Sequence, residues 1–325
     1  MLSLVASIFA FLCFSFTKAL PFSNESAIQV IHTFPNETWI ENLAIRKNGK
    51  ILCTSINRAA IYQVNPYERT ATLVHQFPFA DMALGIAEVE DDAFAVVTAS
   101  LNGTSAAPAS ARMWKVDMVA WEHGSTHAVE LVANLTNVGL PIGVTTLPDN
   151  KRHVLVADSA KGIIWRVNTE TGAYDVAIAD ILLTYTSPLV PLGVNGIHIL
   201  DHELYFTNTG AGLFGKVMIT ANGSAAGPVQ VIAKNIIPDD FALAANGTAY
   251  IVGDSTLWEV SPAGQVAVLA GPSDPAILGD TSAHFGRTAK DSAVLNIVTN
   301  GGRTGPVDGV VHGGQLLAVN VRALS

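Results

Sequence analysis

The chain has 325 residues, a formal net charge of −9, 14% charged and 49% hydrophobic residues, and a mean hydropathy of +0.36. No cluster of Lys and Arg occurs along it, which argues against nucleic acid or another phosphate backbone as a partner. The low charge content favours small apolar ligands over sugar acids and nucleotides.

The N-terminal segment is typical of a secretory signal peptide. An apolar run from Leu2 to Phe16 is followed by a Thr-Lys-Ala cleavage signal that ends at Ala19. The run is shorter than the about 20 residues that a membrane-spanning helix needs. We therefore expect a signal peptide over residues 1–19, one domain over residues 20–325, no membrane span, and a secreted or secretory-lumen location.

Asn-x-Ser/Thr sequons agree with a secretory route and predict N-glycosylation. They lie at Asn24, Asn36, Asn102, Asn134, Asn222 and Asn246. Asn222 and Asn246 each precede a glycine and fit tight hairpin turns equally well, so both interpretations stay open there.

One cysteine remains after removal of the signal peptide. Cys13 leaves with that segment, whereas Cys53 lies inside the apolar strand ILCTSI. A single cysteine cannot form an internal disulfide, and an apolar strand does not activate a thiol. We expect Cys53 to be buried and inert.

From Ile40 onward the chain repeats one pattern: an apolar strand, a small polar turn, a second apolar strand ending in a small polar residue, then a strand and a closing segment. The copies begin at Ile40, Ala83, Pro141, Val194, Pro238 and Ser282. Repeats of about 40 to 50 residues with four short strands are typical of propeller blades. The predicted fold is all-β, a six-bladed β-propeller of four-stranded antiparallel blades.

The first turn of each repeat has a position that we expect to face the central channel. In repeat order it is occupied by Glu41, Leu84, Ile142, Asn195, Asp239 and Ala283. Glu41, Asn195 and Asp239 carry the hard oxygen ligands that suit Ca²⁺ or a similar divalent ion. They equally suit turn residues and a solvated carboxylate, and the spacing alone does not separate these alternatives.

The blade openings Glu41-Asn42-Leu43, Asn195-Gly196-Ile197 and Pro238-Asp239-Asp240-Phe241 resemble those of regucalcin/gluconolactonase-like propellers. The resemblance implies one divalent metal held by Glu41, Asn195 and Asp239, with Asp239 also the general base. Blade three departs from the pattern: lactonases place a polar substrate-contacting pair there, and this chain has Pro141-Ile142-Gly143. That departure speaks against hydrolysis of sugar lactones.

A narrower likeness lies in PDDFALAANGTAYIV from Pro238 and TSAHFGRTAKDSAVLNIVTNGG from Thr281. These segments resemble a fungal secreted branch of the propellers that serves secondary metabolism, including the hetero-Diels–Alderases of tropolone-sesquiterpenoid biosynthesis. The resemblance implies an enzyme that joins an o-quinone methide to a humulene-type alkene. Its partners would be small apolar natural-product intermediates, and the cyclisation would require no cofactor. A divalent-metal-dependent lactonase or ester hydrolase is the alternative, and a non-catalytic binding propeller is the third.

The sequence lacks the common nucleophile and metal motifs. It contains no G-x-S-x-G, no H-E-x-x-H, no P-loop, and no G-x-G-x-x-G between a strand and a helix. A pericyclic step needs none of them, because its rate comes from orientation and from a hydrogen bond to the oxygen where charge builds.

We therefore assign candidate roles in a cyclisation. His284 is the candidate hydrogen-bond donor in catalysis, and Asp239 is the second candidate catalytic residue. The candidate substrate-binding residues are Trp39, Ile142, Phe241 and Phe285. Ordinary packing between blades is the alternative for each aromatic side chain.

Overall fold

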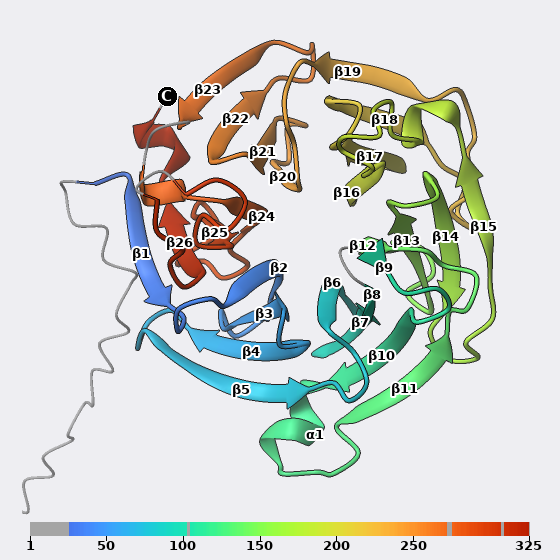
Figure 1. The fold of residues 1–325 in the computed structure, drawn as a ribbon, viewed down its shortest axis with the longest axis horizontal. Helices are drawn as coiled ribbons and strands as arrows, with labels where there is room; N and C mark the ends of the chain where they lie inside the picture. Colours follow the sequence, from blue (N-terminus) through green and yellow to red (C-terminus); the bar gives the residue numbers. More distant parts are fainter. Residues whose placement is uncertain (1–25, 103–104, 272–274, 307–308, 325) are drawn as a thin grey trace, which may run out of the picture.

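The computed structural model describes residues 26–102, 105–271, 275–306 and 309–324. Its strands form a closed ring of blades around one axis (Figure 1). The expected signal peptide and Asn24 lie outside the described residues.

Each blade is a four-stranded antiparallel sheet, and the innermost strand comes first in the chain in blades one to five, whereas blade six takes its outermost strand from the N-terminal side of the chain. Blades one to three consist of β2 (Trp39–Ile45), β3 (Ile51–Ile56), β4 (Ala60–Asn65) and β5 (Thr70–Gln76); β6 (Met82–Glu90), β7 (Ala93–Ala99), β10 (Arg112–Asp117) and β11 (Val129–Asn134); and β12 (Pro141–Thr146), β13 (His153–Asp158), β14 (Ile163–Asn168) and β15 (Tyr174–Ala179).

Blades four to six consist of β16 (Val194–Leu200), β17 (Glu203–Asn208), β18 (Leu213–Met218) and β19 (Gln230–Lys234); β20 (Phe241–Leu243), β21 (Ala249–Gly253), β22 (Thr256–Val260) and β23 (Val266–Ala270); and β24 (Asp280–Phe285), β25 (Leu295–Thr299), β26 (Gln315–Val319) and β1 (Ile28–Thr33). Blades one and two join into one eight-stranded sheet through the single pair Ile56 and Met82. The strand order of these six blades confirms the prediction of an all-β, six-bladed propeller.

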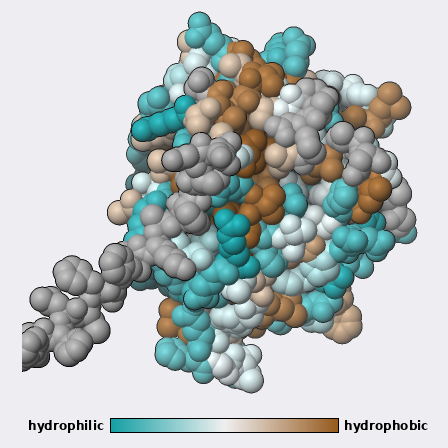
Figure 2. Space-filling view, turned by 90° about the vertical axis from the view of Figure 1, so that its left-hand side faces the viewer, coloured by the Kyte–Doolittle hydropathy of each residue, from teal (hydrophilic) through white to brown (hydrophobic). Residues whose placement is uncertain are grey.

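The ring closes in blade six, where the first described strand pairs with the last. β1 runs antiparallel to β26, from Ile28 opposite Val319 to Thr33 opposite Gln315. This pairing covers the sheet edge that β26 would otherwise expose. Seen from the side where β1 and β26 meet, hydrophobic side chains reach the surface between hydrophilic patches (Figure 2).

Helix is scarce in the described residues. It consists of α1 (Met118–Glu122) and three short 3-10 turns, η1 (Ile181–Leu183), η2 (Pro275–Ile277) and η3 (Val321–Ala323). No helix in this part of the chain combines the length and the apolar character needed to cross a bilayer. A small hairpin, β8 (Leu101–Asn102) and β9 (Ser105–Ala106), extends from blade two between β7 and β10.

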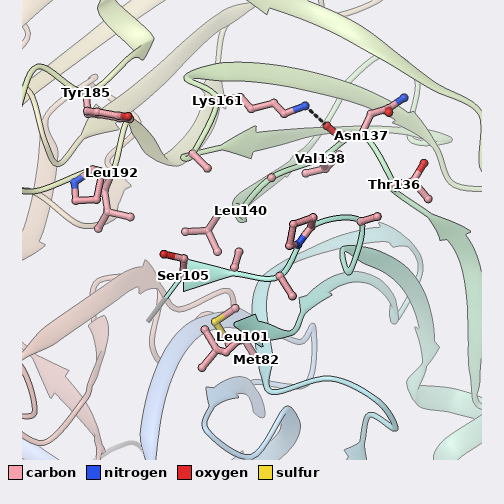
Figure 3. Close-up of a pocket in the computed structure, with 17 residues that line it drawn as sticks. Met82, Leu101, Ser105, Thr136, Asn137, Val138, Leu140, Lys161, Tyr185 and Leu192 are labelled. Carbon is pink, nitrogen blue, oxygen red and sulfur yellow. Dashed lines mark hydrogen bonds between the residues drawn. The ribbon is translucent and has the colours of Figure 1, made fainter. Parts of the chain in front are cut away.

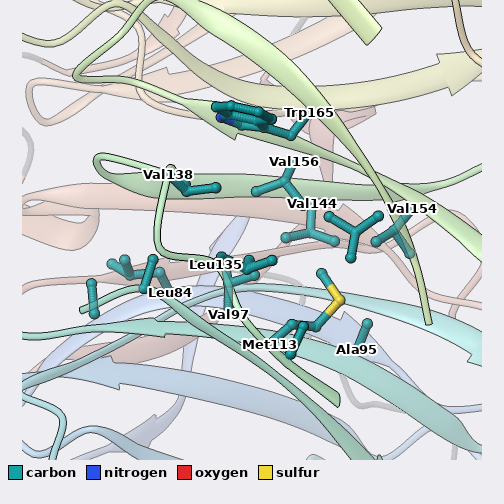
Figure 4. Packing of buried hydrophobic residues seen from close by; sticks show 14 of the residues in the cluster. Leu84, Ala95, Val97, Met113, Leu135, Val138, Val144, Val154, Val156 and Trp165 are labelled. Carbon is teal, nitrogen blue, oxygen red and sulfur yellow. The ribbon is translucent and has the colours of Figure 1, made fainter. Parts of the chain in front are cut away.

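The core consists of apolar layers between neighbouring blades. Figure 4 shows the layer between blades two and three, where Val97 and Met113 face Val144, Val154 and Val156. The alternation of inward and outward side chains along each strand produces these layers. Cys53 is fully buried in the equivalent layer beside blade one, and burial raises the pKa of its thiol, as predicted for an inert cysteine.

The innermost strands approach one another closely around the axis, and glycines make this possible. A Cβ at Gly85 would lie 2.2 Å from the carbonyl oxygen of Ile142, and one at Gly143 would lie 2.2 Å from that of Asn195. The register of β6, β12 and β16 shifts at these same positions. A bulge there re-aims one side chain, and the side chains beside these glycines are those that line the channel.

Candidate functional site

A cavity of about 330 Å³ lies at the mouth of the central channel, and we call it the channel pocket. Side chains from all six blades line it, including five of the six predicted channel positions: Glu41, Leu84, Ile142, Asn195 and Asp239. Blade six contributes Asp280 instead of the predicted Ala283. Ala283 is fully buried in the layer between blades five and six, so its assignment to the channel was wrong.

The channel pocket has an acidic part and an apolar part. The carboxyl groups come from blades one, five and six, on Glu41, Asp239, Asp254 and Asp280. The apolar wall comes mainly from blades two and three and the segment before blade four, with Met82, Leu84, Leu140, Ile142 and Leu192. No Ser, Cys, Lys or His occurs among the described lining residues, so these residues offer no thiol or amine nucleophile, and their hydroxyl groups are those of Thr209 and Thr304.

Hydrogen bonds fix the polar side chains of this pocket. Trp39 Nε1 donates to Glu41 Oε2 at 2.7 Å. Asn195 Nδ2 donates to Asp239 Oδ1 at 2.7 Å and to Thr209 Oγ1 at 3.0 Å. The Thr209 hydroxyl in turn donates to the carbonyl oxygen of Pro238 at 2.8 Å. The acidic part is therefore a pre-organised array across blades four and five, with a second bonded pair in blade one.

Glu41, Asp239 and Asp280 hold their protons more tightly than ordinary carboxyl groups, because their pKa values are raised. Burial raises the pKa of Glu41 to about 7; the Trp39 hydrogen bond opposes the shift and the negative charge of Asp240 adds to it. The pKa of Asp239 lies well above its ordinary value because of burial and repulsion from Glu41 and Asp240. Burial also raises the pKa of Asp280. Near neutral pH the pocket thus carries less negative charge than its carboxyl count suggests.

Glu41, Asn195 and Asp239 are the side chains that could hold the divalent metal that the fold family implies. Glu41, Asn195 and Asp239 line one pocket, and Asn195 Oδ1 is buried without a hydrogen-bond partner in the described part of the chain. An unpartnered amide oxygen beside two carboxyl groups suits a hard cation. Among the described residues, however, no group of three or more His, Cys, Asp or Glu is arranged to hold a metal ion. The fit is therefore limited to these three side chains, with water completing the coordination.

A second cavity, of about 520 Å³, adjoins the channel pocket, and we call it the side pocket (Figure 3). The two share Met82, Leu140 and Leu192 as lining residues. The walls of the side pocket come from the β8–β9 hairpin and from the segments around Val138 and Tyr185. Sequence reasoning missed it entirely, because these segments lie outside the repeated strands.

Comparison with known proteins shows which family the chain belongs to. No family profile matches it. A Sarocladium schorii protein named "Putative hetero-Diels-Alderase asR5" is 30% identical over 311 residues, which cover 83% of this chain and 77% of that protein. The chain belongs to this hetero-Diels-Alderase family. A Phoma protein, "Putative hetero-Diels-Alderase", is 28% identical over 332 residues, covering 91% of this chain and 94% of that protein.

Solved structures show the fold of this hetero-Diels-Alderase family member. Regucalcin from Agrobacterium tumefaciens, described as a calcium-binding protein, superposes with a TM-score of 0.63 at 17% identity and covers 90% of this chain and 94% of its own. A gluconolactonase from Xanthomonas campestris gives a TM-score of 0.60 at 13% identity, covering 90% and 88%. The predicted resemblance to regucalcin/gluconolactonase-like propellers and to hetero-Diels–Alderases is confirmed by these similarities.

The structure separates the predicted site residues of this hetero-Diels-Alderase family member into two groups. Trp39 and Ile142 line the channel pocket with Glu41, Asn195 and Asp239. Phe241 is fully buried and packs edge-on against Phe214 and His198, and Phe285 packs edge-on against Tyr250. Neither Phe241 nor Phe285 lines the channel pocket or the side pocket.

His284 also lies away from both pockets. Its ring is 5.8 Å from that of His198, and burial together with His198 lowers its pKa to about 4. His198 shares a 2.9 Å hydrogen bond with Asp240 Oδ1, and Ser282 Oγ donates to Asp240 Oδ2 at 2.6 Å. The imidazole of His284 is thus neutral and packed beside this polar cluster, and its catalytic role stays a prediction.

The described sequon residues are all exposed: Asn36, Asn102, Asn134, Asn222 and Asn246. Asn222 and Asn246 also accept backbone hydrogen bonds from Ser224 and Thr248, as tight turns require. Exposure permits glycosylation, which stays a prediction.

Proposed function

We propose that this protein accelerates a hetero-Diels–Alder cyclisation between an o-quinone methide of tropolone type and a humulene-type sesquiterpene alkene. Family membership supports a cyclase, and the observation that carries the proposal is the composition of the channel pocket. An apolar wall with Leu84 and Ile142 faces an array of buried carboxyl and amide groups. Such a site can hold a flat polar heterodiene against an apolar alkene.

The reaction is balanced without any external reagent. The C=C–C=O system of the quinone methide supplies four π electrons and the alkene supplies two. One C–C bond forms at the exocyclic carbon and one C–O bond at the carbonyl oxygen, which closes a dihydropyran and restores the aromatic ring. No proton moves and no group leaves, so the protein contributes orientation and electrostatic stabilisation.

The residues of the channel pocket match this demand. Negative charge builds on the quinone methide oxygen as the bonds form, and a buried carboxyl group that keeps its proton can donate a hydrogen bond to it. Hydrogen bonds from Trp39 and Asn195 fix the positions of the Glu41 and Asp239 carboxyl groups, which could supply such a donor. A divalent cation held by Glu41, Asn195 and Asp239 would instead polarise the same oxygen as a Lewis acid.

The test is an assay of the purified protein with the two substrate classes. The quinone methide is generated in situ from its hydroxymethyl precursor, and the adduct is followed by chiral chromatography against a protein-free control. We expect faster product formation and one dominant stereoisomer. Equal rates and equal isomer ratios with and without protein would overturn the proposal.

A metal-dependent lactonase is the second candidate. One observation favours it: Glu41, Asn195 and Asp239 meet in a single pocket. Turnover of simple lactones that a chelator abolishes, without any cyclisation, would transfer the assignment to this hydrolase.

A further inference from the structure

We propose that the side pocket is the binding site of the hydrocarbon partner, while the channel pocket takes the oxygen-bearing heterodiene. The inference deepens the proposed function and rests on it. It assigns a second ligand site to the molecule, for a large and wholly apolar alkene.

The two pockets meet through a shared wall. Met82 begins the innermost strand of blade two, Leu140 directly precedes that of blade three, and Leu192 lies just before that of blade four. All three side chains line both cavities. A ligand in the side pocket therefore contacts the same side chains as a ligand in the channel pocket, which is the proximity that a bimolecular cyclisation needs.

The lining of the side pocket suits a hydrocarbon. Of the 17 described residues that line it, only Lys161 carries a charge, and none of them has a carboxyl group. The Lys161 ammonium donates to the carbonyl oxygen of Asn137 (Figure 3). It also lies 5.8 Å from the centre of the Trp165 ring. Lys161 is exposed, so its ammonium can stay in contact with water while the rest of the lining is largely small or aliphatic.

Exposed apolar side chains surround the entrance. Leu101 on β8 is 42% exposed and Tyr185 is 40% exposed, and both line the pocket. Leu189, 91% exposed, and Val190, 41% exposed, directly precede the pocket residues Pro191 and Leu192 in sequence. Large aliphatic side chains gathered at the mouth of an apolar cavity mark a ligand site.

The volumes of the two pockets also indicate which substrate each pocket binds. Small-molecule sites occupy about 300–1,000 Å³. The channel pocket, at about 330 Å³, is at the lower end of that range and fits one flat ring system. The side pocket, at about 520 Å³, is the larger space and has no carboxyl group among its described lining residues, so the bulkier hydrocarbon belongs there.

The experiment fills the side pocket without touching the channel pocket. Ala160 is exposed, lines the side pocket and lies in the turn between β13 and β14, so Ala160→Trp places an indole into the cavity. Thr136→Trp, at another exposed lining residue, is the second variant. Ala263→Trp, on the exposed turn between β22 and β23, is the matched control.

Binding of α-humulene, a sesquiterpene hydrocarbon without oxygen, is measured by titration calorimetry on the full chain, alongside binding of tropolone. We expect both pocket variants to weaken humulene binding at least about tenfold, the control to change it less than about twofold, and tropolone binding to stay within about twofold in all three. Unchanged humulene affinity in both pocket variants would overturn the inference.

The binding experiment and the turnover assay distinguish failure of the side-pocket inference from failure of the proposed reaction. If humulene binding depends on Ala160 and Thr136 but no cyclisation occurs, the side pocket stands as a hydrocarbon site and the proposed reaction is wrong. If cyclisation occurs and both tryptophan variants keep wild-type rate and stereoselectivity, the reaction stands and the side pocket has no part in it.

Discussion

The channel pocket and the side pocket share three lining residues and differ in the charged groups that line them. Among the described lining residues, the channel pocket has four carboxyl groups and no basic side chain, whereas the side pocket has one lysine and no carboxyl group. The channel pocket is built from the starts of the innermost strands, and the side pocket is built from loops and the β8–β9 hairpin. A propeller can thus keep a polar array fixed by its repeats while connecting segments determine which apolar molecule lies beside it.

The largest effect should come from Gly196→Ala, in the innermost strand that carries Asn195 of the channel pocket. A Cβ at Gly196 would lie 2.1 Å from Asp240 Oδ1, while Asp240 is held by His198 and Ser282. We expect a loss of about 3 kcal/mol or more in the free energy of unfolding, measured with urea. Gly227→Ala is the control, since a Cβ there meets nothing within 4 Å. Equal stability of the two variants would contradict the tight approach of the innermost strands.

The second prediction uses the pH dependence of stability to test the channel pocket. The folded pKa of Glu41, about 7, exceeds its ordinary value of 4.5, so the folded state holds this proton more tightly. This stabilisation is fully present below pH 4.5 and is lost as the pH rises through 7, by on the order of 2–3 kcal/mol. Glu41→Gln should flatten that part of the profile, measured with EDTA present, while humulene binding stays unchanged. A profile identical to wild type would show that Glu41 titrates normally.

The architecture and the channel positions could be predicted from sequence because both depend on the repeat. Glu41, Leu84, Ile142, Asn195 and Asp239 all line the channel pocket. Blade six was misaligned, because β24 begins at Asp280 and its register shift lies between Asp280 and Ser282, before the residue that was aligned. Matching Asp280 opposite Thr299 to Ile40 opposite Ser55 aligns Thr281 with Glu41, so the pocket residue Asp280 lies one position before the channel position of blade one.

Side chains away from the repeat start could not be placed by the same reasoning. Phe241 begins β20 two residues after Asp239, yet its side chain is fully buried in the core between blades four and five. The side pocket depends on how non-repeated loops fold over blades two to four, and no periodic signal describes those loops. The low charge content of the sequence agrees with the apolar ligand that we propose for this pocket.

A smaller effect is expected from Ile142→Ala, which enlarges the apolar part of the channel pocket. Ile142 is 7% exposed and faces the carboxyl groups across the cavity. We expect the cyclisation rate to fall about tenfold and the stereoisomer ratio to fall with it, because the partners lose their fixed approach. Chiral chromatography of the adduct measures both. A slower reaction with unchanged selectivity would mean that Ile142 does not orient the substrates.

The smallest effect is expected from Asp239→Asn on the cyclisation. An amide keeps a donor at this position next to Asn195, so the rate should change less than about threefold. The same change should remove any lactone hydrolysis that uses Asp239 as base or metal ligand. Loss of nearly all cyclisation would show that the charge of Asp239, or a metal that it binds, is essential.

The most direct test of the two-pocket account is a crystal structure of the protein with the dihydropyran adduct bound. We predict that the new oxygen heterocycle lies in the channel pocket near Glu41 and Asp239. The hydrocarbon ring should extend past Met82 and Leu140 into the side pocket. An adduct confined to the channel pocket, or bound at another face of the propeller, would contradict the account.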